Sequence, residues 1–336
     1  MSAPSPPVEP TPDPSVTAPH RGCDVSVVIV SYRSADVLEP CLRSVCAAMA
    51  GLDGEIIVVD NASPDDSRAV AAAMPGVRVL GLDDNLGFGP AVNRGAAASA
   101  GRHLVLVNPD AEIGPDALVE LIRFADEHPA HGIYGGRART PDGSADPRSC
   151  FGLPSPWSMF CFATGLSSAF RRSPVFDPTS LGRWPRDTVR EVGAVSGCLL
   201  LAPRRAWDEL GGFDEDYFLY GEDIDLGARA WEAGLRPVVV PGAEVVHRVG
   251  ASTPDGVERT VRLLTGRATY LRKRWHGTAR VWGRAMLVVG VAGRAGAEAV
   301  LAALGGPDRG DRWRRVWRRR RTWMAGYAAD GTPRRG

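Results

Sequence analysis

Residues 24–60, DVSVVIVSYRSADVLEPCLRSVCAAMAGLDGEIIVVD, contain two apolar runs separated by a helix-like segment. The runs are rich in Val and Ile and are typical of buried strands. Ser34, a common helix N-cap residue, precedes the segment between them, and Gly51 marks its end. This strand, helix, strand pattern predicts a parallel sheet covered by helices on both faces.

The same alternation continues along the chain. Ser63 and Pro64 are residue types of an N-cap and a first helical position, so we expect a helix there. Further strands are expected at residues 77–80, 103–107, 192–202 and 237–246. The sequence therefore predicts an α/β domain, and ligands of such domains bind beyond the carboxyl ends of the strands.

Polar residues fall at three of these strand ends: Ser31, Asp60 and the triplet Asn108, Pro109, Asp110. The Asp60 carboxylate is placed to accept hydrogen bonds from a pyrimidine or a ribose, although an Asx turn explains it equally well. Asp110 is placed to bind a hard divalent cation together with diphosphate oxygens. A plain turn is the alternative for this triplet.

Two further motifs suit a nucleotide ligand. Residues 85–95, NLGFGPAVNRG, place glycines such as Gly87 before a helix start, where a diphosphate can bind, although Gly-rich helix entries are common. His247 ends the apolar strand region VVVPGAEVVH and is a candidate second metal ligand. A structural histidine is the alternative.

Residues 211–226, GGFDEDYFLYGEDIDL, carry six carboxylates interleaved with aromatic side chains. Glu222, Asp223 and Asp225 come immediately before the helix-like residues 226–233, which Gly234 ends. Acids at a helix start complement the helix dipole, and this is the simplest explanation of the cluster. The aromatic residues among them favour a pocket that needs a general base.

The charge distribution divides the chain. Residues 1–258 hold 21 basic and 35 acidic side chains, whereas residues 259–336 hold 19 basic and 4 acidic ones. A basic tail attached to an acidic body indicates an anionic partner, and the acidic body favours a membrane over nucleic acid. The proline-rich residues 1–22 lack an apolar h-region, so we expect a disordered leader and a cytoplasmic protein.

Two apolar segments bear on membrane contact. Residues 312–321, RWRRVWRRRR, place Trp313, Val316 and Trp317 on one helical face, which suits a bilayer interface. Residues 149–170 lack charges, but their prolines and serines predict an irregular segment, either a lip that meets lipid or an insert that packs in the core. Residues 285–293 are too short to span a bilayer. We therefore expect peripheral attachment.

Taken together, the motifs VSVVIVSY (25–32), VVDNAS (58–63), NLGFGPAVNRG (85–95), NPD (108–110), SGCLLLAPR (196–204) and the acidic stretch resemble family 2 inverting glycosyltransferases of GT-A fold. The closest resemblance is to their rhamnosyltransferase branch. It implies a GT-A domain at 23–256 with a mostly parallel sheet. Beyond that domain, the composition predicts a basic helical membrane-associating region at 257–325 and a disordered tail at 326–336.

The resemblance also implies roles for particular residues. Asp223 would be the catalytic base, and Asp110 and His247 would hold Mg²⁺ or Mn²⁺, weakly because Asn108 stands where relatives often have an acid. The donor site would comprise Ser31, Asp60, Asn61, Asn85, Gly87, Asn93, Asn108 and Asp110. The acceptor site or its support would comprise Gly197, Asp214, Glu222 and Asp225.

The implied activity is transfer of L-rhamnose from a dTDP donor to a polyprenyl-diphosphate-linked glycan in cell-envelope polysaccharide synthesis, at the inner face of the plasma membrane. One alternative is transfer of another hexose, including galactofuranose, from UDP. A catalytically silent membrane-surface binding module is the other. The donor sugar, the acceptor, the linkage, strict metal dependence and the oligomeric state stay open at this point.

Overall fold

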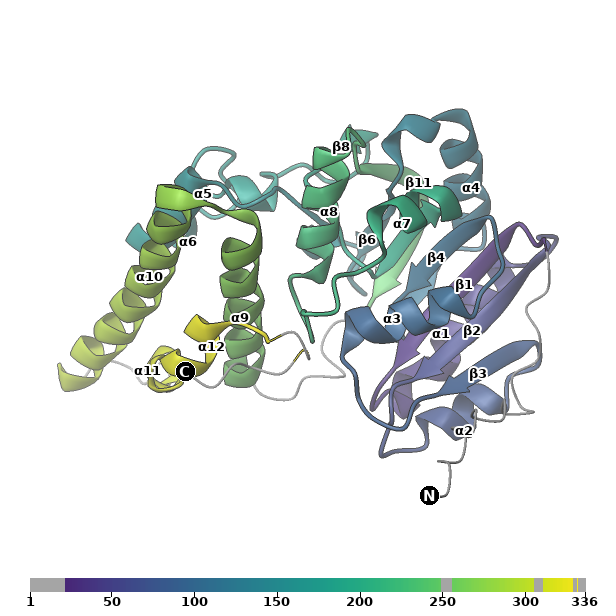
Figure 1. Ribbon diagram of the computed structural model, residues 1–336, viewed down its shortest axis with the longest axis horizontal. Helices are drawn as coiled ribbons and strands as arrows, with labels where there is room; N and C mark the ends of the chain where they lie inside the picture. Colours follow the sequence, from purple (N-terminus) through teal and green to yellow (C-terminus); the bar gives the residue numbers. More distant parts are fainter. Residues whose placement is uncertain (1–21, 249–255, 305–310, 329–330, 332–336) are drawn as a thin grey trace, which may run out of the picture.

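The computed structural model describes residues 22–248, 256–304, 311–328 and 331, and Figure 1 shows a sheet with helices on both faces beside a group of C-terminal helices. The strands are β1 (Val25–Ser31), β2 (Gly54–Asp60), β3 (Val77–Gly81), β4 (His103–Val107), β5 (Ala111–Ile113), β6 (Tyr134–Arg139), β7 (Cys150–Phe151), β8 (Arg190–Glu191), β9 (Ala194–Val195), β10 (Leu199–Pro203) and β11 (Val238–His247). The α-helices are α1 (Ala35–Ala48), α2 (Ser67–Ala72), α3 (Phe88–Ala97), α4 (Ala117–Glu127), α5 (Pro156–Thr164), α6 (Leu166–Ala169), α7 (Arg204–Leu210), α8 (Glu222–Glu232), α9 (Gly256–Arg274), α10 (Gly277–Ala303), α11 (Arg312–Arg318) and α12 (Arg320–Ala325).

The central sheet has the strand order β3-β2-β1-β4-β10-β6-β11-β5, and β8 pairs with β11. β1 is parallel to β2 and β4, β2 is parallel to β3, and β6 is parallel to β11. β10 is antiparallel to both of its neighbours. β5 and β8 are antiparallel to β11. The predicted α/β class with a mostly parallel sheet is confirmed, and these antiparallel strands were not foreseen.

Alternate residues of β1 build the two apolar layers of the domain. Val27 and Ile29 pack on one face of the sheet with α1 and α4, whereas Val28 and Val30 pack on the other with α3 and α8. Successive side chains of a strand point to opposite faces, so a strand buried on both faces reads as a continuous apolar run. This explains why the first strands could be recognised from the sequence.

The helix predicted after β2 begins later than expected. Ser63 is not its N-cap, because α2 starts at Ser67 with Asp66 in the capping position. The Ser63 backbone N–H instead donates to Asp60 Oδ2 at 3.4 Å, in the Asx-type turn that was the alternative. The local turn therefore overrides the helix-start signal of Ser63 and Pro64.

The acidic cluster and the uncharged segment are both more helical than the sequence suggested. α8 begins at Glu222, so the acids lie within its first turn instead of before it. Residues 149–170 are not irregular, because α5 forms there with a capping box between Ser155 and Ser158. The two alternatives for this segment apply to different residues. Trp157 is 45% exposed, as a lip requires, whereas Phe162 packs against the C-terminal helices, as a core insert would.

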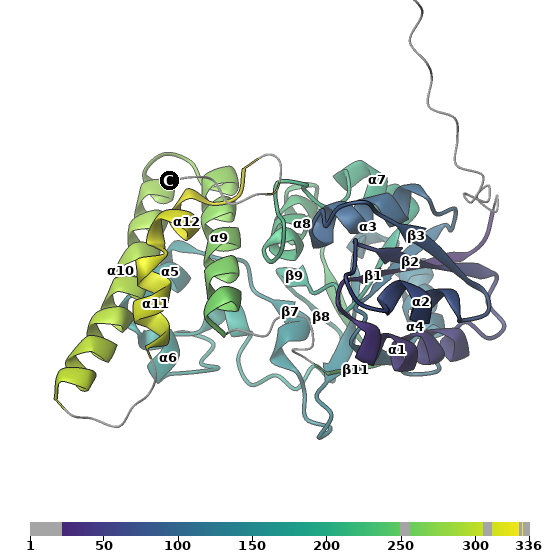
Figure 2. The same ribbon diagram turned by 90° about the horizontal axis from the view of Figure 1, so that it is seen from below.

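The C-terminal helices form a compact group with an apolar core of their own. Figure 2 shows α9, α10, α11 and α12 side by side, with α5 beside α10. Val316 and Trp323 are fully buried in this core, and Trp313 and Trp317 pack against it. The apolar face of the basic run is therefore turned toward α9 and α10. The expectation of disorder from residue 326 is wrong for Tyr327, which is 1% exposed.

α10 is much longer than the apolar run 285–293 that the sequence drew attention to. It has 27 residues, and its most apolar window of 18 residues has a mean hydropathy of 1.6, with 22% of that window buried. In the described part of the chain it is the one helix long and apolar enough to cross a membrane, judged by length and composition alone. The premise that this segment is too short to span a bilayer is therefore wrong.

Replacing Trp323 tests whether the basic tail is part of the folded protein. Trp323→Ala removes a buried ring and its hydrogen bond to the Val316 carbonyl, 3.0 Å away. We expect a loss of about 3–5 kcal/mol in the free energy of unfolding, measured by denaturant titration. Trp282→Ala is the control, because that ring is 44% exposed on α10. Equal stabilities of the two variants would contradict the proposed core.

Candidate active site

Ser31 and Asp60 lie side by side at the carboxyl ends of β1 and β2, where they are register partners. Both side chains are buried, at 0% and 3% exposure. Asp60 Oδ2 accepts the turn bond from Ser63, but Asp60 Oδ1 and Ser31 Oγ have no hydrogen-bond partner among the described residues. An unsatisfied buried polar atom costs about 1–3 kcal/mol. Two such atoms at adjoining strand ends indicate a polar ligand.

Asn61 and Asn85 hold the Gly-rich loop beside this position. Asn61 Nδ2 donates to Asn85 Oδ1 and to the Gly87 carbonyl, both at 3.0 Å, and Asn61 Oδ1 accepts from the Leu86 backbone N–H at 2.9 Å. Gly87 has φ +90°, and a Cβ there would lie 2.3 Å from the Phe218 carbonyl oxygen. Only glycine permits this approach between the loop and the acidic stretch.

Asn93 makes a second connection between the two motifs. Its side-chain amide donates to the Phe213 carbonyl at 2.8 Å, and its carbonyl accepts from the Phe213 backbone N–H at 3.0 Å. It also donates to Glu215 Oε1 at 3.2 Å. Asn93 thus holds the acidic stretch against α3, so it supports the site from behind.

Asp110 and His247 come together as the sequence predicted, with 3.2 Å between Asp110 Oδ1 and His247 Nε2. Asp146, which the sequence analysis missed, lies 3.5 Å from the other ring nitrogen. Burial opposes protonation of His247, but the hydrogen bonds and charges of both carboxylates outweigh it and raise the histidine pKa to about 9. No sequence motif marks Asp146, because it lies in a turn 101 positions before His247.

A metal ion is not excluded by this arrangement, but its ligands would be few. Within residues 22–248, 256–304, 311–328 and 331, no three or more His, Cys, Asp or Glu side chains form a metal-binding group.

Gly197 lies beside Asn108, since a Cβ on Gly197 would be 3.9 Å from Asn108 Oδ1 and 2.9 Å from the Phe88 ring. Gly197 therefore leaves room between Phe88 and the Asn108 amide.

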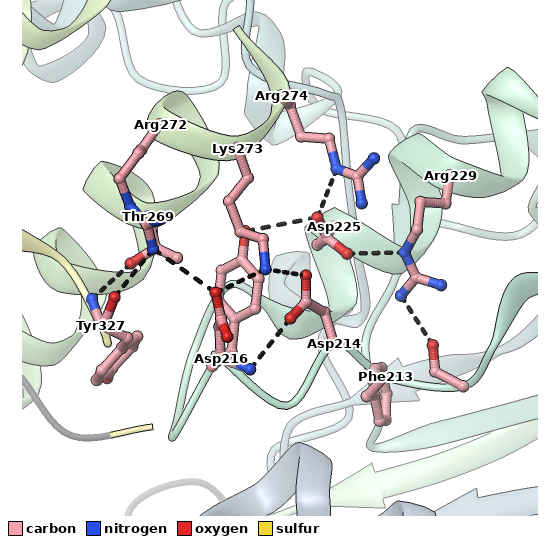
Figure 3. Close-up of polar contacts among 12 residues, drawn as sticks. Phe213, Asp214, Asp216, Asp225, Arg229, Thr269, Arg272, Lys273, Arg274 and Tyr327 are labelled. Carbon is pink, nitrogen blue, oxygen red and sulfur yellow. Dashed lines mark hydrogen bonds and ion pairs between the residues drawn. The ribbon is translucent and has the colours of Figure 1, made fainter. Parts of the chain in front are cut away.

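Asp214 and Asp225 belong to an ion-pair cluster that joins the acidic stretch to α9 (Figure 3). Lys273 Nζ lies 2.6 Å from Asp214 Oδ2 and 2.7 Å from Asp216 Oδ2. Asp225 is fully buried and forms ion pairs with Arg274 Nε at 2.6 Å and with Arg229 Nε at 2.8 Å. Asp225 therefore supports the site and does not face an acceptor.

Lys273 and Arg274 pair with carboxylates of the acidic stretch, and the sequence did not indicate these contacts. Lys273 is the only lysine of the chain, and this rarity was the one signal available. This rarity does not indicate that Lys273 pairs with Asp216, which lies 57 positions earlier in the chain. The basic composition of α9 suggested an anionic ligand outside the protein, whereas two of its charges neutralise carboxylates within it.

Glu222 and Asp223 stand in the first turn of α8 and differ in accessibility. Glu222 is 5% exposed, and its Oε2 has no hydrogen-bond partner among the described residues, whereas Asp223 is half-buried. Burial raises the pKa of both carboxyl groups, and the charge of Asp223 raises that of Glu222 further. Among the described residues, the carboxylate of Asp223 accepts a hydrogen bond from the Ile224 backbone N–H at 2.8 Å. Asp223 is thus the member of the pair that a substrate hydroxyl can reach.

Close contacts join the start of α8 to α3. A Cβ on Gly89, in α3, would lie 3.2 Å from the Phe213 side chain and 3.7 Å from Glu222 Cβ. The start of α8 therefore packs directly on the helix that follows the Gly-rich loop. A nucleotide held at Asp60 and a base at Asp223 would flank one reaction centre, which suits displacement chemistry between them.

Comparison with known proteins agrees with this geometry. A family model described as Glycosyl transferase family 2 matches residues 26–179, and one described as Glycosyl transferase family group 2 matches residues 185–334. N-acetylglucosaminyl-diphospho-decaprenol L-rhamnosyltransferase of Mycobacterium tuberculosis is 37% identical over 241 residues, which are 68% of this chain and 76% of the relative.

Solved structures with low sequence identity share the fold. A mannosyltransferase from Pyrobaculum calidifontis, solved with GDP-Man and Mn²⁺, matches with a TM-score of 0.51 and 19% identity over 95% of this chain and 88% of that one. GalNAc-T7, solved with UDP, GalNAc and Mn²⁺, matches with a TM-score of 0.52 and 16% identity over 75% and 48% of the two chains. These structures show the fold, whereas the two family models and the mycobacterial relative show that the chain belongs to glycosyltransferase family 2 and is a glycosyltransferase of the rhamnosyltransferase type.

Proposed function

We propose that this glycosyltransferase moves L-rhamnose from dTDP-rhamnose to a polyprenyl-diphosphate-linked glycan in cell-envelope synthesis. The similarity to the mycobacterial L-rhamnosyltransferase carries the proposal, since it extends over 68% of the chain. The orphaned polar atoms of Ser31 and Asp60 support it, because a nucleotide base or ribose would supply their missing hydrogen bonds. The half-buried Asp223 supplies the base that the transfer requires.

Asp223 acts as general base in the proposed reaction. Its carboxylate takes the proton of the acceptor hydroxyl while that oxygen forms a bond to the anomeric carbon, and the bond from this carbon to the donor diphosphate breaks. Such a base contributes about 10²- to 10⁴-fold to the rate. Glu222, buried beside it with a raised pKa, keeps a proton more readily and so leaves the negative charge on Asp223.

Asp110 and His247 would hold a divalent cation weakly. Mg²⁺ and Mn²⁺ accept one carboxylate with diphosphate oxygens and waters, but His247 could join these ligands only after losing the proton that Asp110 and Asp146 stabilise. The pair lies 3.2 Å apart at the strand ends that would face the diphosphate. A bound cation would stabilise the charge that develops on the departing nucleotide. Asn108 offers a neutral amide oxygen where a second acid would bind the metal more firmly.

The outer side of α10 is the best candidate for contact with the inner face of the plasma membrane. Val281, Trp282, Val289 and Val300 are 44–68% exposed on this side, which carries no charge. The charged residues of α10 lie on the opposite side, where Arg294 donates to the Phe162 carbonyl at 2.9 Å. Such inward charges and outward apolar side chains are expected of a protein surface that meets lipid.

Replacing the base tests the mechanism. Asp223→Asn keeps the shape of the side chain but cannot take a proton, so we expect kcat for rhamnose transfer to fall by about 10²- to 10⁴-fold. Because burial raises the pKa of the Asp223 carboxyl group above its ordinary value, the wild-type rate should fall as the pH drops below that raised pKa and the base becomes protonated. The rate of the Asp223→Asn variant should not show this decrease at low pH. Asp53→Asn is the control, an exposed carboxyl group just before β2. Full transfer activity of Asp223→Asn would refute the assignment.

A thermal-shift titration tests the donor and the metal together. We expect dTDP-rhamnose to raise the melting temperature more than UDP-hexoses or UDP-galactofuranose, and Mg²⁺ or Mn²⁺ to add a further shift. A ligand at 100 times its Kd stabilises a protein by about 2.7 kcal/mol. Asp110→Asn should lose the metal-dependent part alone, and Asp53→Asn should keep it. An equal metal effect in Asp110→Asn would exclude Asp110 as a ligand.

Charge placed on the α10 face tests the membrane proposal. The double variant Val289→Glu and Val300→Glu should weaken binding to vesicles containing anionic lipid by at least about tenfold, because it places two carboxylates where apolar side chains would enter the interface. Val119→Glu is the control, since that side chain is 45% exposed on α4, outside the C-terminal helices. Unchanged co-sedimentation of the double variant, with an unchanged melting temperature, would place the membrane contact elsewhere.

A further inference from the structure

A cavity of about 220 Å³ lies where α9 passes the start of α8. The acidic stretch contributes Tyr220, Gly221 and Ile224 to its wall, so the cavity adjoins the proposed base Asp223 in the chain. α9 contributes Leu263 and several neighbours to the wall. The lining is mainly apolar, and none of its residues belongs to the donor side of the site.

Arg267 is the cation of this wall that lacks an anionic partner. Among the described residues it has no hydrogen bond or ion pair, and its guanidinium lies 5.4 Å from the ring centre of Phe162. Burial lowers its pKa, and the nearby charge of Arg294 acts in the same direction. Arg294 itself is satisfied by the Phe162 and Gly290 carbonyls. An arginine held this way favours an incoming anion.

A second charge and a second cavity extend this wall. Arg312, from α11, is held toward the cavity by Thr260, whose hydroxyl it contacts at 2.6 Å. Arg267 also lines an adjoining cavity of about 230 Å³, where Asp177 is the nearest acidic side chain. The two arginines outnumber that single carboxylate, so the combined surface is complementary to an anion with an apolar attachment.

We propose that the cavity beside α9 binds the diphosphate and the first isoprene units of the lipid-linked acceptor, with Arg267 and Arg312 on the diphosphate. The proposal rests on the proposed function and assigns its acceptor subsite. Leu263, 45% exposed, and Trp313 contact the isoprene chain, which is too large for the cavity and leaves past Leu263. The sugar beyond the diphosphate then lies at the start of α8, where Asp223 stands.

Arg267→Met tests the diphosphate contact with two acceptors that carry the same sugar. One has a short-chain lipid diphosphate and the other an uncharged alkyl linker. We expect the variant to raise KM for the diphosphate acceptor by about 10- to 100-fold, the loss typical of a charged hydrogen bond. KM for the uncharged acceptor, KM for dTDP-rhamnose and slow donor hydrolysis by water should not change. Arg318→Met, which removes an exposed charge of α11, is the matched control.

Leu263→Gln tests the lipid contact with little risk to folding, because the side chain is half-exposed. Wild-type protein should bind diphosphate acceptors more tightly as isoprene units are added, and the variant should lose most of this gain. If wild-type protein transfers rhamnose but Arg267→Met matches Arg318→Met, or Leu263→Gln keeps the chain-length effect, the cavity is not the acceptor subsite. If wild-type protein neither hydrolyses dTDP-rhamnose nor transfers rhamnose to any acceptor, the proposed function itself is wrong.

Discussion

The carboxylate of Asp225 is fully buried and is shared by Arg229 of its own helix and Arg274 of α9. A buried charge is expensive unless it is paired, and removal of one partner typically costs about 3–5 kcal/mol. This cluster therefore fixes where α8 can lie relative to α9. Because Asp223 stands two residues before Asp225, the position of the proposed base depends on the same ion pairs.

A second set of contacts fixes the acidic stretch against the donor side. Asn93 binds both backbone polar groups of Phe213, and the Phe88 backbone N–H donates to the Phe218 carbonyl at 2.8 Å. The stretch is thus held between α3 and α9, so a shift of either helix would move the base relative to a bound nucleotide. Displacement chemistry is sensitive to such shifts, since misplacement by about 1 Å can cost about 10²-fold in rate.

The parts of the fold that the sequence predicted are those set by local pattern. β1, β2 and β4 carry uninterrupted apolar runs because they are buried on both faces. Strand-end positions singled out Asp60 in β2, Asp110 beyond β4 and His247 in β11, and the structure places the last two in contact. Their roles in binding stay predictions.

The parts that the sequence did not predict depend on distant contacts. The sequence of a basic helix is the same whether its charges face lipid or an internal carboxylate. The pairing of Lys273 with Asp214 therefore could not be predicted from the sequence. The apolar face of α11 likewise suits a membrane or a helical core equally well, and it packs on the core. The predicted helix start at Ser63 was wrong for a local reason. The Ser63 backbone N–H donates to Asp60 Oδ2 in a turn, so Ser63 does not begin the helix.

The ion pairs at Asp225 and Lys273 also bear on what counts as a domain. Composition divides the chain near residue 257, yet α9 carries the cations that neutralise the acidic stretch before that point. A shortened protein ending before α9 would retain the whole nucleotide side, but Asp214 would lose Lys273 and Asp225 would keep only Arg229 of its own helix. The basic helices therefore supply counter-charges to the acidic stretch across the position at which the composition changes.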